Sequence, residues 1–118
     1  MLAAARCNAP LGIQNGRLRA SQLTASSIIN KNGAPTFGRL QQQKKRASYG
    51  AWVAKHNNHQ QWLQADFRRT VRITKICTQG RQDAHHWVTR YTLSYSLDGI
   101  HWARYKSARS TNKVGEFV

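Results

Sequence analysis

Acidic residues are scarce in this sequence. Four carboxylates, Asp66, Asp83, Asp98 and Glu116, stand against 19 lysines and arginines, and the formal net charge is +15. Catalysis by paired carboxylates needs two acids close together, and a calcium site needs several oxygen ligands. Both are poorly supplied here. No nucleophile, base and acid form a recognisable set either, so we expect no enzyme and no cofactor.

Long apolar runs and cysteines are also few. No stretch approaches the length that spans a bilayer. Residues 1–6, which we interpret as an N-terminal lead segment, are too short for a signal-peptide core and follow no basic region. The sequence therefore shows no secretory signal. The two cysteines, Cys7 and Cys77, leave open a disulfide, two free thiols, or one half of a bridge whose partner is missing.

What the sequence does contain suits one domain with one core. It has 118 residues, 40% of them hydrophobic, with four tryptophans, four tyrosines and three phenylalanines. Its positive charge favours polyanionic partners such as nucleic acid, heparin-like glycans or acidic lipid surfaces, and charge alone does not choose among them.

Short strands separated by turns are predicted, with no amphipathic helix. Leu63, Ala65 and Phe67 share one face at period two, and residues 91–97 alternate in the same way. Asp98-Gly99 then predicts a hairpin with a two-residue type I′ turn before residues 100–105. This pattern indicates an all-β antiparallel sandwich or barrel. The predicted strands cover residues 24–29, 62–67, 71–78, 91–97 and 100–105.

A series of motifs resembles one known family. They are Cys7-Asn8-Ala9-Pro10-Leu11-Gly12, Ser21-Gln22-Leu23-Thr24-Ala25-Ser26-Ser27, Gly38-Arg39-Leu40, Gly50-Ala51-Trp52, Gln61-Trp62-Leu63-Gln64-Ala65-Asp66-Phe67, Thr78-Gln79-Gly80-Arg81, Trp87-Val88-Thr89, and Tyr95-Ser96-Leu97-Asp98-Gly99 with Trp102. In this order they resemble the discoidin, or coagulation factor V/VIII type C, domain. The resemblance implies a jelly-roll-like antiparallel β-sandwich that binds extracellular surfaces through loops at one end.

Departures from the family pattern lead to further expectations. The family continues past the strand of Trp102 to a closing cysteine, so we expect residues 7–118 to form a discoidin-like domain that lacks its final strands. Cys7 then has no family partner, although a bridge to Cys77 stays open; Cys77 is otherwise expected to be a buried thiol. Arg81-Gln82-Asp83 lies where some relatives carry Arg-Gly-Asp, and Gln82 argues against integrin binding through it.

The family pattern places three loops at residues 30–36, 44–49 and 81–87. In the third loop, polar groups and an aromatic face suit a sugar; alternatively, Arg81 and Asp83 only hold the loop together and Trp87 belongs to the core. His85-His86 is a poor chelate because neighbouring strand side chains diverge, so no metal site is expected.

The ligand-binding candidates are Asn30, Asn32, Lys44, Lys45, Arg46, Tyr49, Arg81, Asp83, His86 and Trp87.

The resemblance implies cell-surface recognition, with glycans or glycoproteins as partners and cell adhesion as the outcome. The alternative is attachment to anionic phospholipid, such as phosphatidylserine, or to glycosaminoglycan through the basic run Lys44-Lys45-Arg46; a solvated loop without a ligand is the plainer interpretation of that run. Nothing suited to base stacking accompanies it, which argues against nucleic acid. An extracellular location is implied by the family alone. Trp52, Trp62 and Trp102 are expected to be packing residues.

Overall fold

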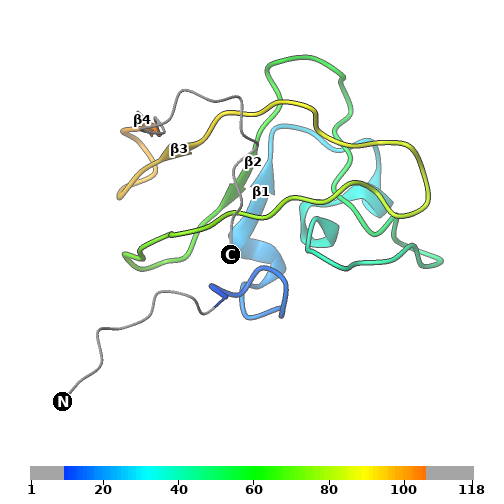
Figure 1. Cartoon of the computed structure of the whole chain (residues 1–118), viewed down its shortest axis with the longest axis horizontal. Helices are drawn as coiled ribbons and strands as arrows, with labels where there is room; N and C mark the ends of the chain where they lie inside the picture. Colours follow the sequence, from blue (N-terminus) through cyan, green and yellow to red (C-terminus); the bar gives the residue numbers. More distant parts are fainter. Residues whose placement is uncertain (1–9, 106–118) are drawn as a thin grey trace.

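The computed structural model describes residues 10–105, which form two small antiparallel sheets joined by long loops (Figure 1). Within this range there is no α-helix, which agrees with the all-β prediction, and no helix is long and apolar enough to cross a membrane. Cys7 and residues 1–6 lie outside the described residues. The elements in chain order are η1 (Ala20–Gln22), β1 (Leu23–Ala25), η2 (Lys31–Gly33), η3 (Pro35–Phe37), β2 (Leu63–Ala65), β3 (Ser94–Tyr95) and β4 (Ala103–Arg104), the η elements being single 3-10 turns.

The pairing of β1 with β2 is the centre of the fold. The strands run antiparallel with Leu23 opposite Ala65 and Ala25 opposite Leu63. Backbone hydrogen bonds continue the ladder at both ends, from Ser26 N to Trp62 O (3.0 Å) and from Asp66 N to Gln22 O (2.8 Å). The predicted strands at 24–29 and 62–67 are therefore present, although each is shorter than its sequence pattern.

Residues 26–53 leave β1 and fold back beside it. Ile29 N donates to Val53 O (2.8 Å), and Val53 N donates to Gly33 O (3.0 Å). A side chain at Gly33 would be crowded, because a Cβ would lie 3.0 Å from side-chain atoms of both Ile29 and Val53. Arg39 secures the following turn by donating to Thr36 O and Ile13 O (2.9 and 2.7 Å), and partial burial lowers the pKa of its guanidinium. This excursion carries two of the three predicted loops.

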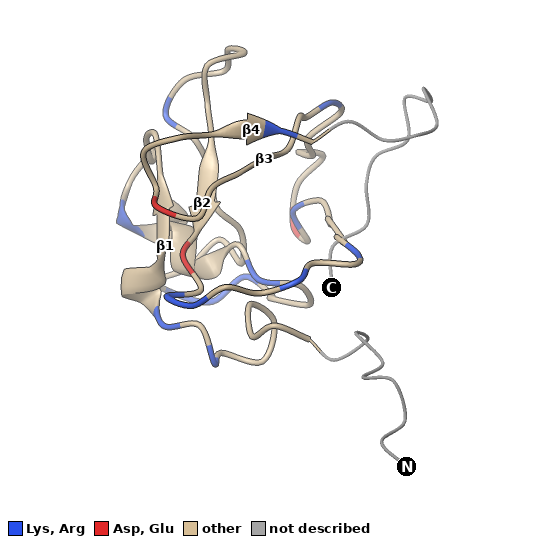
Figure 2. Ribbon diagram, turned by 90° about the vertical axis from the view of Figure 1, so that its left-hand side faces the viewer, with Lys and Arg blue, Asp and Glu red and all other residues tan. Residues whose placement is uncertain are grey.

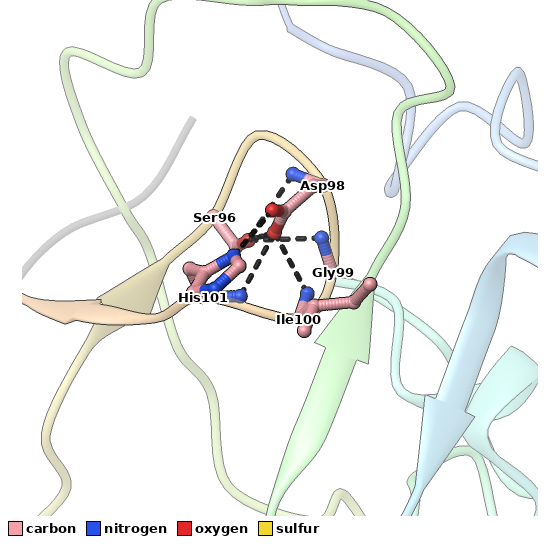
Figure 3. A network of polar contacts seen from close by, with 5 residues as sticks. All are labelled: Ser96, Asp98, Gly99, Ile100 and His101. Carbon is pink, nitrogen blue, oxygen red and sulfur yellow. Dashed lines mark hydrogen bonds and ion pairs between the residues drawn. The ribbon is translucent and has the colours of Figure 1, made fainter.

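The second sheet is the predicted hairpin, with a different turn. Ser94 pairs with Arg104 and Tyr95 with Ala103, one residue out of the register that a two-residue Asp98-Gly99 turn requires. Gly99 has a positive φ (75°) but Asp98 does not, so the predicted type I′ turn is wrong. The Asp98 side chain instead accepts from Ile100 N and His101 N (both 2.8 Å) and pairs with His101 Nδ1 (2.7 Å), as Figure 3 shows.

The core of the described residues is small. Its buried apolar members are Leu18, Leu23 and Ile76, each at most 7% exposed. Ile76 comes from residues 71–78, where the structure has an extended segment and no named strand, so the predicted strand there is wrong.

The predicted packing residues are only partly buried. Trp62 and Trp102 are about half exposed, whereas Trp52 is half-buried and its indole Nε1 donates to Ser27 O (2.9 Å). Cys77 is a free thiol and half-buried, so the prediction of full burial is wrong. Residues 91–97 do not bury their alternating face either, since Leu97 is 89% exposed.

Candidate functional site

The three predicted loops lie together at one end of the molecule, which we call the loop end (residues 30–36, 44–49 and 81–87). Figure 1 shows the loops of residues 44–49 and 81–87 side by side on the right, beyond η2 and η3. Side-chain and backbone contacts join them, although residues 30 and 86 are far apart in the sequence. The loop end is therefore a connected surface.

Tyr49 joins the first loop to the second. Its hydroxyl accepts a hydrogen bond from Asn30 Nδ2 (2.9 Å), and its backbone N donates to Asn32 O (2.9 Å). Asn30 Oδ1 also accepts from Asn32 N (2.9 Å), which closes η2 at its start. Asn30 and Asn32 thus shape the first loop. Asn32 Oδ1 is buried without a hydrogen-bond partner among the described residues.

Arg81 joins the third loop to the second. Its guanidinium carbon lies 4.4 Å from the centre of the Tyr49 ring, a cation–π contact. The same guanidinium forms two hydrogen bonds to Asp83, from Nε to Oδ1 (2.6 Å) and from Nη2 to Oδ2 (3.3 Å). Lys44 Nζ approaches Asp83 Oδ2 from the neighbouring loop at 3.6 Å. The hydrogen bond from Arg81 is the main reason that the pKa of Asp83 lies below its ordinary value.

The basic run forms a tight exposed turn. Lys45 N donates to Ser48 O (2.8 Å) and Ser48 N to Lys45 O (3.2 Å), which places Arg46 at the tip. The side chain of Lys44 is 58% exposed despite its contact with Asp83. Gly50 ends the turn at φ 67°, where a Cβ would lie 2.6 Å from the backbone of Gln43. The turn therefore presents its cations to solvent.

The third loop closes on itself around an open hollow. Arg81 N donates to His86 O (2.9 Å), and residues 80–87 line a hollow of about 420 Å³. Trp87 is 64% exposed at its edge, so the interpretation of Trp87 as a core residue is wrong. His86 contributes its carbonyl to the loop, and its side chain is exposed with that of His85.

Two inter-loop contacts have no counterpart in the sequence reasoning. Gln41 N donates to Gln79 Oε1 (2.8 Å), and Lys44 N donates to Gln82 Oε1 (3.3 Å). Gln82 thus fastens the third loop to the second, and Gln79 joins the segments that lead into these two loops. A glutamine in a polar loop belongs to no sequence pattern that predicts its hydrogen-bond partner.

Metal-ligating residues do not gather anywhere in residues 10–105. No group of three or more histidines, cysteines, aspartates or glutamates in that range is arranged to hold an ion. The adjacent His85 and His86 have no third partner of this kind within the same range. The chemistry of the loop end is that of exposed cations, an exposed indole and one carboxylate that is already engaged.

Comparisons with known proteins match this architecture. A model of the F5/8 type C domain matches residues 22–117. The chain is 37% identical over 108 residues to the human EGF-like repeat and discoidin I-like domain-containing protein 3, covering 87% of this chain and 22% of that protein. It is 36% identical over 116 residues to rat (Rattus norvegicus) lactadherin, covering 92% of this chain and 26% of lactadherin.

Mouse (Mus musculus) coagulation factor V is 36% identical over 110 residues, which make up 88% of this chain and 5% of factor V. The chain thus spans about a quarter or less of the length of each of these relatives.

Proposed function

Because the chain belongs to the F5/8 type C, or discoidin, domain family, whose fold is a β-sandwich, we propose that it is a non-enzymatic extracellular module that attaches to anionic phospholipid surfaces through its loop end. The observation that carries this proposal is the meeting of exposed cations and an exposed tryptophan on one connected set of loops.

Charge favours an acidic surface. The loop end contains five cations and the single carboxylate of Asp83, so it has four positive charges in excess. The cations are Lys31, Lys44, Lys45, Arg46 and Arg81. Each Lys or Arg near an acidic membrane contributes about 1 kcal/mol to binding. An indole suits the boundary between water and lipid because it has an apolar body and one polar N–H. The 64% exposed Trp87 supplies that group.

Vesicle binding tests the proposal directly. The purified chain is sedimented with vesicles of phosphatidylcholine alone and with vesicles that also contain phosphatidylserine. We expect binding only to the second kind, with a blue shift of tryptophan emission and loss of binding as salt rises. Equal binding to both kinds of vesicle, or to neither, would refute attachment to anionic phospholipid.

Glycan recognition is the second candidate, and the hollow of about 420 Å³ favours it. Trp87 would supply an aromatic face for a sugar ring, and the hollow's polar groups would bind its hydroxyls. Asp83 is a weaker sugar acceptor than its type implies, because Arg81 and Lys44 already engage both its oxygens. Retention on a galactose-type resin, released by free sugar at high salt and lost in Asp83→Ala, would establish this candidate. Release by salt alone would exclude it.

A further inference from the structure

Exposed arginines gather on a second surface, away from the loop end. Figure 1 places the turn after β2 on the left and the loops of residues 44–49 and 81–87 on the right. Figure 2 looks at the left-hand side and shows Lys and Arg concentrated below β1 and β2. We call this surface the arginine face. We assign to it the exposed arginines of the segments that flank the β1–β2 pairing. These are Arg17 and Arg19 before β1, and Arg68, Arg69 and Arg72 after β2.

Antiparallel pairing brings the two halves of the arginine face together. The chain enters β1 beside the point where it leaves β2, because Leu23 is paired with Ala65. Gln22 spans the junction by accepting from Arg19 N (3.0 Å) and donating to Asp66 O (2.9 Å). Arg68 Nη2 reaches across to Ser21 Oγ (3.1 Å). The surface therefore rests on the hydrogen-bonded pairing of β1 with β2.

Neighbouring acids offset little of this charge. Asp66 is the nearby carboxylate, and its Oδ1 accepts from Arg68 N (2.8 Å) within the turn. The side-chain ion pairs found within residues 10–105 join Lys44 and Arg81 to Asp83, and His101 to Asp98. None of them involves the arginine face, which holds five cations against one carboxylate.

We infer that the arginine face binds a sulfated glycosaminoglycan chain, independently of the proposed attachment of the loop end to phospholipid. Guanidinium groups match the oxygens of sulfate with paired N–H donors, and the surface spans several such groups. Single-stranded nucleic acid is the less fitting polyanion because its bases stack on exposed aromatic rings. Phe67, the aromatic residue next to Arg68, is half-buried.

The two surfaces lie apart, so they can bind their ligands at the same time. A glycosaminoglycan on the arginine face leaves the loop end uncovered, so one chain can hold a membrane and a matrix polymer at once. Competition between the two ligands would be expected if both used the same basic loops.

Two charge-matched variants test the inference. The first, R17Q/R19Q/R69Q, removes three cations from the arginine face and leaves the Arg68–Ser21 hydrogen bond in place. The second, K44Q/K45Q/R46Q, removes three cations from the loop end. Binding of each full-length variant to a heparin oligosaccharide is measured over a series of salt concentrations, in parallel with a single-stranded DNA of equal length and with phosphatidylserine vesicles.

We expect the heparin affinity of the first variant to fall by about tenfold or more. The slope of log Kd against log salt concentration should fall by up to about three, because binding releases fewer counterions. It should keep vesicle binding. The second variant should keep most of its heparin affinity. Equal losses in both variants would overturn the inference, since they would mean that net charge alone binds heparin. Tighter binding to DNA than to heparin, lost in the first variant, would reassign the surface to nucleic acid.

Failure of vesicle binding in the unaltered protein would refute the proposed function and leave the heparin comparison intact. A far-UV spectrum and an unfolding curve for each variant confirm that it remains folded.

Discussion

Neutralising the basic turn of the loop end gives the sharpest test of membrane attachment. K44Q/K45Q/R46Q removes three cations, each worth about 1 kcal/mol at an acidic surface. Lys44 contributes less than the others, because Asp83 already lies 3.6 Å from its ammonium group and an exposed pair is worth about 0–1 kcal/mol. The variant should therefore lose about 2–3 kcal/mol of binding free energy, or roughly 30- to 150-fold in affinity for phosphatidylserine vesicles.

Vesicle titration followed by tryptophan emission measures that affinity, and R17Q/R19Q/R69Q is the control with the same net charge. The control should change vesicle affinity by less than about threefold. If the control loses as much as the loop variant, long-range charge rather than the loop end governs attachment, and the reasoning fails. A loop variant with unchanged affinity would refute it equally.

Three other predictions concern the core, the exposed indole and the hairpin turn. Leu23→Ala should lower the free energy of unfolding in urea by about 2–5 kcal/mol, because the Leu23 side chain in β1 is buried, with 5% exposure; an unchanged midpoint would mean that the small core does not hold the fold. Trp87→Ala should change that free energy by less than about 0.5 kcal/mol and still weaken vesicle binding, and a large loss of stability would instead place Trp87 in the core. The hydrogen bond from the His101 side chain, followed by those from backbone amides, holds the pKa of Asp98 below its ordinary value of 3.8. The stability that the turn gains is therefore present above pH 3.8 and is lost as pH falls through the lower folded pKa, and an NMR titration with a midpoint at or above 3.8 would contradict this.

Local pattern predicted the strands best where a turn residue or a paired strand reinforced it. The hairpin of β3 and β4 was predicted from alternation around Asp98-Gly99, and the pairing is antiparallel as expected. Its turn type was not, because the Asp98 carboxylate and the Ser96 hydroxyl gather the amides of residues 98–101 and shift the register by one residue. The preference of Asp-Gly for a two-residue turn takes no account of hydrogen bonds from these side chains to the backbone of the turn.

Burial was the least predictable property. Alternation at residues 91–97 identifies which side chains share a face, but it does not say whether anything covers that face, and Leu97 is 89% exposed. The alternative that placed Trp87 in the core was wrong for the same reason. The family pattern, by contrast, grouped the three loops correctly in space, whereas their fastening through Tyr49 and Arg81 depends on distances that no sequence pattern contains. The ligand roles of the loop residues, the absence of a closing partner for Cys7 and the domain bounds of 7–118 stay predictions.

The position of Tyr49 has a consequence for the thermodynamics of recognition. Asn30, Asn32 and Arg81 all contact this residue, so the loops are held in one arrangement before any ligand arrives. A binding surface that is already ordered loses less conformational entropy on association, and more of its contact energy then appears as affinity. Tyr49→Phe would remove only the hydrogen bond from Asn30. It should therefore leave the association rate constant unchanged and raise the dissociation rate constant, which shortens the lifetime of the complex.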